Sequence, residues 1–276
     1  MTPVLTVPVV LDERAIDALA YEASAAPAGR RAVVDARQVR STDPHGAAGL
    51  LLLGHALAQK GRRPLLQLPR NRDGVERFTQ LGFGRIAHEV FELSAGDRAR
   101  MEGESEGALL EFTSIRSVDD VNAVLDTLSE RAGMVLTDTL HYGDPEVDAF
   151  GAMLRDLLHG LVEYSEAPQG WVCIQAQRRL RRIGRPAVMI AVVDISGGWE
   201  GAPEGALAAH PHLARVHEHV GTSGGQVAIR GGTTRLVGGS RPKQASASLE
   251  TDLAPIPGAQ ISILLPGRRK AVIQEE

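Results

Sequence analysis

Up to about residue 94, short apolar runs alternate along the chain with longer stretches whose apolar positions recur at helical spacing. Residues 31–36 form a continuous apolar run typical of a buried strand, and residues 46–60 form a strongly apolar helix that Gly61 ends. Further strands are predicted at residues 4–10, 64–69 and 88–93, and further helices at residues 12–23 and 73–81. Strands that alternate with helices predict an α/β domain over residues 1–94, with a largely covered sheet.

The pattern changes after residues 95–107, a polar stretch without periodicity whose composition is that of a linker. In residues 108–276 most helices come first and most strands follow, which predicts an α+β two-layer sandwich as a second domain. Its helices are expected from the Ser117 start signal to about residue 132, at 145–166 and at 213–220. Its strands are expected at residues 109–115, 171–177, 187–194, 226–230, 234–237 and 259–265.

Composition narrows the classes of function. The 276 residues include 30 Lys and Arg against 34 Asp and Glu, and only 4% are aromatic, so we expect no binding to nucleic acid. No uninterrupted apolar stretch approaches the ~18 residues of a membrane span, so we expect no membrane contact. The single cysteine, Cys173, lies in an apolar run and cannot form an internal disulfide, which favours a reducing, cytoplasmic location.

The segment RAVVDARQVRSTDPHGAAGLLLLGHALAQKGRRPLLQLP runs from a strand into a tight turn, Asp43 to Gly46, that opens an apolar helix. This layout resembles the STAS domain of anti-sigma-factor antagonists in bacterial partner switching, over about residues 1–94. The resemblance implies that Asp43, Pro44 and His45 meet a protein partner. Regulated members carry a phosphorylated serine where this chain has Pro44, which has no hydroxyl. We therefore expect Asp43 to act as a helix cap and the site not to be phosphorylated.

The remainder of the chain resembles the GHKL ATPase fold of histidine kinases and anti-sigma kinases, over about residues 105–276. The resemblance rests on the helix LRDLLHGLVEYSE, the strand WVCIQAQ, the strand and turn AVVDISGGWEG, and the ending PGAQISILLP. It implies an ATP site in which a helical acid can activate water and an asparagine four residues later orients Mg²⁺. The matching residues are Asp156 and Gly160, and Gly160 has no ligand atom.

The same resemblance implies an adenine pocket built on an aspartate at a strand end and on following glycines. Asp194 and Gly198 keep these positions as a candidate remnant of the pocket, while Ser196 replaces the first glycine. Asp194 can alternatively be a turn acid that ends a buried strand. The glycine-rich phosphate cradle of the family is replaced by residues 210–213, His-Pro-His-Leu, where bulky rings and a proline without an N–H crowd the helix start.

Two further features of the implied ATP site are missing from the sequence. Ala259 stands where the resemblance implies a threonine, and the implied lid between Asp194 and His210 is nearly deleted. Several missing polar contacts lower nucleotide affinity by orders of magnitude, so we expect a pseudo-ATPase without a cofactor. The favoured function is non-catalytic signalling by protein–protein binding in a partner-switching-like system. The two domains are expected to pair within one chain or within a homodimer.

Two alternatives stay open. An ATP-binding regulator or an anti-sigma-type serine kinase would use Asp156, Asp194 and Gly198 with ATP and Mg²⁺. An enzyme acting on another ligand would use His159 and the C-terminal histidines as acid–base groups. The histidines at 210, 212, 217 and 219 have no accompanying cysteine, and the last two face different sides of a helix, so no metal site is expected. The basic run at 178–185 is expected at a hairpin tip between two strands, and the alternative is a patch for an acidic partner or nucleic acid.

Overall fold

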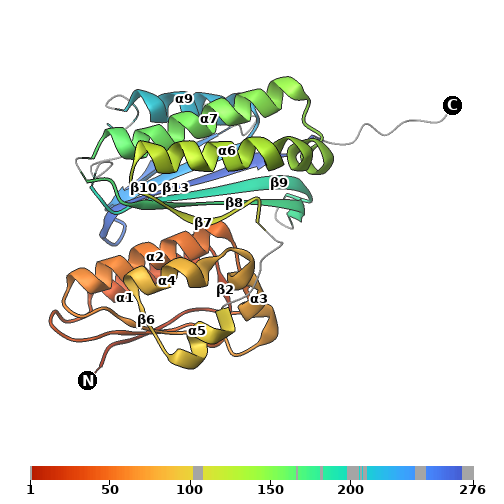
Figure 1. The fold of residues 1–276 in the computed structure, drawn as a ribbon. Helices are drawn as coiled ribbons and strands as arrows, with labels where there is room; N and C mark the ends of the chain where they lie inside the picture. Colours follow the sequence, from red (N-terminus) through yellow and green to blue (C-terminus); the bar gives the residue numbers. More distant parts are fainter. Residues whose placement is uncertain are drawn as a thin grey trace.

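The computed structural model describes residues 2–101, 108–165, 167–180, 183–197, 205, 207, 210–239 and 247–268. In this part of the chain the elements form four layers (Figure 1). Three helices cover one face of a seven-stranded antiparallel sheet, and helices from the N-terminal part cover its other face. A four-stranded parallel sheet lies beyond those helices.

The parallel sheet is built by residues 2–101, with the strand order β1-β3-β5-β6. Its strands are β1 (Val4–Thr6), β3 (Val33–Asp35), β5 (Leu65–Gln67) and β6 (Glu92–Leu93). A separate parallel pair joins β2 (Val10–Leu11) to β4 (Ser41–Thr42). The helices of this part are α1 (Glu13–Ser24), α2 (Pro44–Gln59), α3 (Arg72–Gln80), α4 (Phe83–Val90) and α5 (Ala95–Met101).

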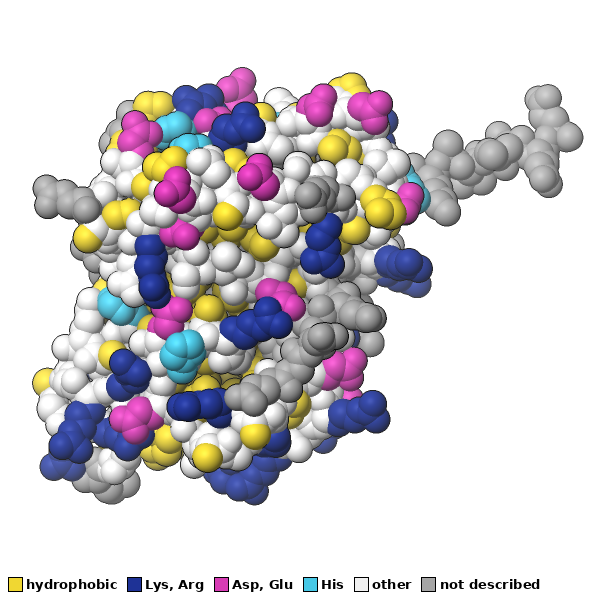
Figure 2. Space-filling model, viewed as in Figure 1, with side chains coloured by type: hydrophobic (Ala, Val, Ile, Leu, Met, Phe, Trp, Pro, Cys, Tyr) yellow, Lys and Arg dark blue, Asp and Glu magenta, His cyan; other side chains and the backbone are white. Residues whose placement is uncertain are grey.

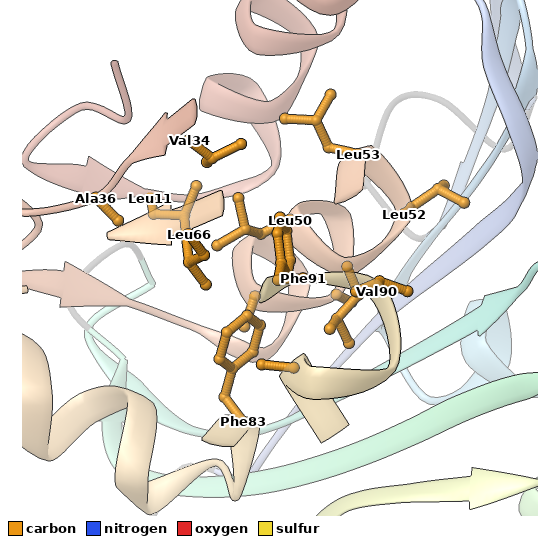
Figure 3. Packing of buried hydrophobic residues seen from close by; sticks show 14 of the residues in the cluster. Leu11, Val34, Ala36, Leu50, Leu52, Leu53, Leu66, Phe83, Val90 and Phe91 are labelled. Atoms are coloured by element: carbon orange, nitrogen blue, oxygen red, sulfur yellow. The ribbon is translucent and has the colours of Figure 1, made fainter. Parts of the chain in front are cut away.

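The middle residue of each three-residue strand is buried against the helices, while its neighbours are half-buried or exposed. Figure 3 shows Leu50, Leu66, Phe83 and Phe91 gathered in the resulting apolar cluster. On the opposite face Val4 is 56% exposed. The prediction of a largely covered sheet is therefore wrong for this face, because the helices lie between the two sheets (Figure 1).

Two local predictions are also corrected. Residues 88–93 were expected as a strand, but α4 continues to Val90 and only Glu92–Leu93 pairs with β5. These residues form a helix up to Val90 because Phe83, Ile86 and Val90 recur at helical spacing and are all buried. The predicted linker at 95–107 begins with helix α5, whose first turn is capped by the Ser94 hydroxyl accepting from the Asp97 amide at 3.0 Å. Residues 102–107 lie outside the described residues.

The antiparallel sheet has the strand order β12-β11-β10-β13-β9-β8-β7. Its strands are β7 (Leu110–Ile115), β8 (Gly170–Leu180), β9 (Arg185–Asp194), β10 (Gln226–Gly232), β11 (Thr234–Gly239), β12 (Ser248–Glu250) and β13 (Ile256–Pro266). The helices are α6 (Val118–Val135), which continues as a π-helical turn at Leu136–Leu140, α7 (Asp144–Glu163) and α9 (Pro211–Thr222). The predicted hairpin at the basic run is confirmed, because β8 and β9 pair as neighbours around it.

Helix α2 lies against the second face of this sheet, over β8, β9 and β13. Six buried residues of that face belong to the same apolar cluster as the N-terminal helices: Phe112, Trp171, Cys173, Ala191, Val193 and Ile256. Residues 108–268 therefore form two layers of their own in the described part of the chain and receive a third from α1, α2 and α4. The division into two domains stays a prediction, since one apolar cluster crosses the expected boundary.

The sequence of α2 suits its position between two sheets. Its residues from Pro44 to Gly54 are buried on all sides and, apart from His45, are not polar, as expected of a helix segment enclosed between two layers, while its last turn reaches the surface at Gln59. Glycine lets α1 approach it closely, because a Cβ atom on Gly49 would lie 2.4 Å from Cγ1 of Ile16. At 16 residues α2 is too short to cross a bilayer, and no other helix in the described ranges is both long and apolar enough to do so.

Candidate functional site

The carboxylate of Asp156 on α7 is held by helix α9. Arg215 donates to it through two atoms, with Nε 2.9 Å from Oδ2 and Nη2 2.6 Å from Oδ1. The Nδ1 atom of His212 lies 3.1 Å from the same Oδ1. The Arg215 guanidinium outweighs partial burial and, with help from His212, holds the pKa of Asp156 below its ordinary value. Asp156 is thus an ionised carboxylate already engaged by a bidentate partner.

A second bridge joins the same two helices. The Nε2 atom of His212 lies 2.6 Å from the carboxylate of Glu163, so this nitrogen carries a proton and donates it. Gly160, where the resemblance implies a magnesium-binding asparagine, is buried on α7 one turn before Glu163. The structure therefore brings the helical acid together with the stretch that replaces the phosphate cradle, and joins them by hydrogen bonds of His212 and by the ion pair of the neighbouring Arg215.

The start of α9 is packed against an aromatic ring. The rings of His210 and Tyr164 meet edge to face with centroids 4.3 Å apart, and the ring of His212 lies 6.1 Å from that of Tyr164. Pro211 occupies the first turn and has no N–H to offer. Burial lowers the pKa of His210, so its ring is neutral at pH 7. In the described residues, this helix start contacts side chains at the place where the resemblance implies phosphate binding.

Asp194 ends β9 and is fully buried. Side chains two positions apart in a strand point to the same face of the sheet. Val192 belongs to the apolar cluster under α6, α7 and α9, so Asp194 also faces these helices. Its Oδ1 accepts from the Ser196 amide at 2.8 Å and from the Ser196 hydroxyl. This contact is an Asx turn, as expected if Asp194 is a turn acid that ends a buried strand. Gly198 lies outside the described residues, so half of the candidate adenine pocket is not placed.

The turn at the start of α2 behaves as a cap. The Asp43 side chain accepts from the Gly46 amide at 2.8 Å, and Pro44 occupies the first turn, which confirms the predicted capping. Both Pro44 and His45 are buried.

The surface that buries this turn is the chain's own antiparallel sheet. His45 Nε2 donates to the carbonyl oxygens of Ile190 and Ile263, at 3.0 and 3.2 Å, and the Gln260 amide donates to the His45 carbonyl at 2.9 Å. The residues predicted to meet a protein partner therefore contact residues of the same chain.

Sequence reasoning missed the charged cluster between α1 and β11. Arg235 Nη2 lies 2.7 Å from both carboxylate oxygens of Asp17, and Arg235 Nη1 lies 3.0 Å from Glu250. Arg230 Nε is 3.6 Å from Asp17, and burial lowers the pKa of Arg230 despite that carboxylate. Asp17 and Arg235 lie 218 positions apart in the chain, and no local pattern pairs such distant residues.

The remaining histidines do not converge. His217 lies against β11, where a Cβ atom on Gly238 would be 2.0 Å from its Nε2, while His219 lies 3.4 Å from the Ser223 hydroxyl. Within the described ranges no group of three or more His, Cys, Asp or Glu residues is arranged to hold a metal ion. His159 is half-buried on α7.

The geometry places Asp156 and Asp194 on the helix-covered side of the sheet, and places Asp43, Pro44 and His45 on the other side. A cavity of about 630 Å³ opens on that other side, lined by His45, Glu13 and Arg235 among others. Comparisons of the chain with family models, with curated proteins and with solved structures gave no match.

Proposed function

We propose that this protein is a non-catalytic regulatory module that acts by binding other proteins, and that residues 108–276 are a pseudo-ATPase. The observation that carries the proposal is the engagement of Asp156 by Arg215 and His212. A carboxylate can take part in magnesium binding or water activation only through lone pairs that are available. Both oxygens of Asp156 are engaged by α9, Oδ1 by two groups and Oδ2 by one, which occupies three of its about four acceptor positions.

Opening the site for nucleotide requires the two hydrogen bonds between Arg215 and Asp156 to be broken. Both side chains are partly exposed, so the pair itself adds little stability, and its bidentate geometry is what occupies the carboxylate. Gly160 supplies no oxygen to a metal that requires near-octahedral oxygen ligands, so nothing on α7 offsets that loss. Pro211 and the two rings packed on Tyr164 leave few backbone donors for phosphate.

The contact between the N-terminal and C-terminal parts of the chain supports the proposal that this protein acts by binding proteins. The cap of α2 and His45 rest on the antiparallel sheet, so this part of the chain acts as a partner for its own C-terminal part. Two folds held in one chain meet at high effective concentration. The proposed output is the docking of a further protein on the paired assembly.

The alternative, an ATP-binding regulator or serine kinase, draws on one observation. Asp194 remains fully buried at the end of β9, facing the helices, as an adenine-binding acid would be. Gly258 also keeps a left-handed φ of 75° beside it. A Cβ atom there would lie 2.1 Å from the Asp194 carbonyl oxygen, which gives this glycine a packing reason of its own.

Phosphoryl chemistry distinguishes the two functions. The full chain is incubated with Mg²⁺ and γ-labelled ATP, and both phosphate release and label transfer to protein are followed. We expect the rate to be the same in wild type, in Asp156→Asn and in Asp148→Asn, a matched control on the exposed side of α7. A rate that Asp156→Asn abolishes and Asp148→Asn leaves unchanged would overturn the pseudo-ATPase and establish the alternative.

A further inference from the structure

A cavity of about 430 Å³ lies at the carboxyl ends of the parallel strands, away from every site described above. Its walls come from the residues after β3 and β6, from β5 and the residues that follow it, and from helix α5. The polar residues that line it are Arg37, Gln67, Arg70, Ser94, Asp97 and Arg100. Crevices at the carboxyl ends of parallel strands are where open α/β sheets bind ligands, and this volume is that of a small-molecule site.

Two of the three arginines are fixed in position. The Arg37 guanidinium grips Asp35 with Nε 2.8 Å from Oδ1 and Nη2 2.6 Å from Oδ2, and holds the pKa of Asp35 below its ordinary value. Arg100 Nη1 donates to the Pro69 carbonyl at 3.0 Å, and its Nη2 pairs with Asp97. Each guanidinium has five N–H groups, so both retain donors beyond these contacts.

The third arginine makes no direct ion pair. Arg70 is exposed, and within the described residues its side chain has no hydrogen bond or ion pair, although its charge contributes, after Arg37, to lowering the pKa of Asp35. Three guanidinium groups thus share two carboxylates, Asp35 and Asp97, which leaves one excess positive charge at the cavity. Lys and Arg side chains are frequent across this lower part of the molecule (Figure 2).

We propose that this cavity binds a small ligand through an oxyanion group, a phosphate ester or a carboxylate. Guanidinium forks match both groups in geometry, and arginines that are already fixed lose little side-chain freedom on binding. Gln67 and the Ser94 hydroxyl add neutral polar groups beside the charged ones. The site is independent of the proposed function, because it lies in the parallel-sheet part of the chain and involves no residue of α7 or α9.

Isothermal titration of the full chain with inorganic pyrophosphate and, separately, with citrate tests the proposal. Arg70→Gln removes the excess charge at an exposed position without breaking a described contact. Arg98→Gln is the matched control, because Arg98 is an exposed arginine of the same α5 helix that carries Arg100 and does not line the cavity.

We expect at least one probe to bind the wild type and Arg98→Gln equally, and Arg70→Gln about tenfold or more weakly, the loss for one charged hydrogen bond. Tighter binding of pyrophosphate would identify a phosphate ligand, and tighter binding of citrate a carboxylate ligand. Absence of binding by both probes at millimolar concentration would overturn the proposal. So would equal losses in the two variants, which would indicate general charge attraction, or an unchanged affinity in Arg70→Gln.

Discussion

Asp17 offers the sharpest test of how α1 is docked on the antiparallel sheet. Both of its carboxylate oxygens lie 2.7 Å from Nη2 of Arg235, and Arg230 Nε lies 3.6 Å away. The side chains of Arg235 and Arg230 are only 10% and 4% exposed, so neither guanidinium can turn to water when the carboxylate is lost. The substitution Asp17→Asn keeps the shape of the side chain and removes its charge.

The size of the effect follows from these contacts. Removing one partner of a buried ion pair costs about 3–5 kcal/mol, and one charged hydrogen bond contributes about 1.5–3 kcal/mol. Asp17 is 26% exposed, and Arg235 keeps Glu250 at 3.0 Å and Glu13 at 3.4 Å. These two features place the loss near the lower bounds, at about 2–3 kcal/mol of unfolding free energy.

Urea denaturation followed by circular dichroism measures this loss. Glu22→Gln is the control, because Glu22 is an exposed acid on the same helix, and it is expected to change the unfolding free energy by less than about 0.5 kcal/mol. Combining Asp17→Asn with Arg235→Gln in a double-mutant cycle isolates the coupling between the two residues. If Asp17→Asn were as stable as the control, α1 would not dock on β11 as described and the reasoning would be refuted.

Three further predictions concern packing, pH and thiol chemistry. Gly49→Ala places a Cβ atom against Ile16 and is expected to lower the unfolding free energy by about 1–3 kcal/mol. Gly151 is a helical glycine with open space around it, so Gly151→Ala is expected to raise the unfolding free energy by up to about 1 kcal/mol. Urea denaturation midpoints of the two variants check this contrast. Because the pKa of Asp156 is lowered on folding, chiefly by Arg215, its stabilising contribution is present at neutral pH and disappears as the pH falls through the ordinary carboxyl value of 3.8 towards the folded one. The stability difference between wild type and Arg215→Gln, measured by urea titration, should therefore be largest near neutral pH and shrink below about pH 4; a constant difference would contradict it. Burial raises the pKa of the Cys173 thiol, so a disulfide reagent should label it only after denaturant is added, and fast labelling of the folded chain would count against its position in β8.

Local structure could be read from the sequence wherever each element carries its own signal. The Asp43 cap and the proline after it marked the start of α2 correctly, because capping depends on residues only a few positions apart. Residues 88–93 show the limit of such signals. A short apolar run there fits a strand as well as a helix, and burial of Val90 beside Phe83 decides for the helix.

Long-range relations could not be predicted in the same way. The strand order puts β13 between β9 and β10, and the Asp17–Arg235 pair joins residues 218 positions apart, so both depend on how the whole chain packs. The candidate site was predicted in part. Comparison with a family pattern pointed to Asp156 and the altered stretch at 210–213, but only the three-dimensional structure joins them through Arg215, whose spacing from Asp156 follows no motif.

The central claim, that the contacts of α9 with Asp156 close the helix-covered side of the sheet to nucleotide, is tested most directly by a thermal-shift titration with ATP and Mg²⁺. Wild type is compared with Asp194→Ala and with Arg70→Gln, so that binding at the helix-covered site is separated from phosphate binding at the arginine-lined cavity. A ligand at ~100 times its dissociation constant would stabilise the fold by about 2.7 kcal/mol, an easily measured rise in Tm. The account predicts that any shift at millimolar ATP is reduced in Arg70→Gln, as expected for binding weaker by about tenfold or more, and persists in Asp194→Ala. A shift that Asp194→Ala abolishes and Arg70→Gln leaves intact would contradict it.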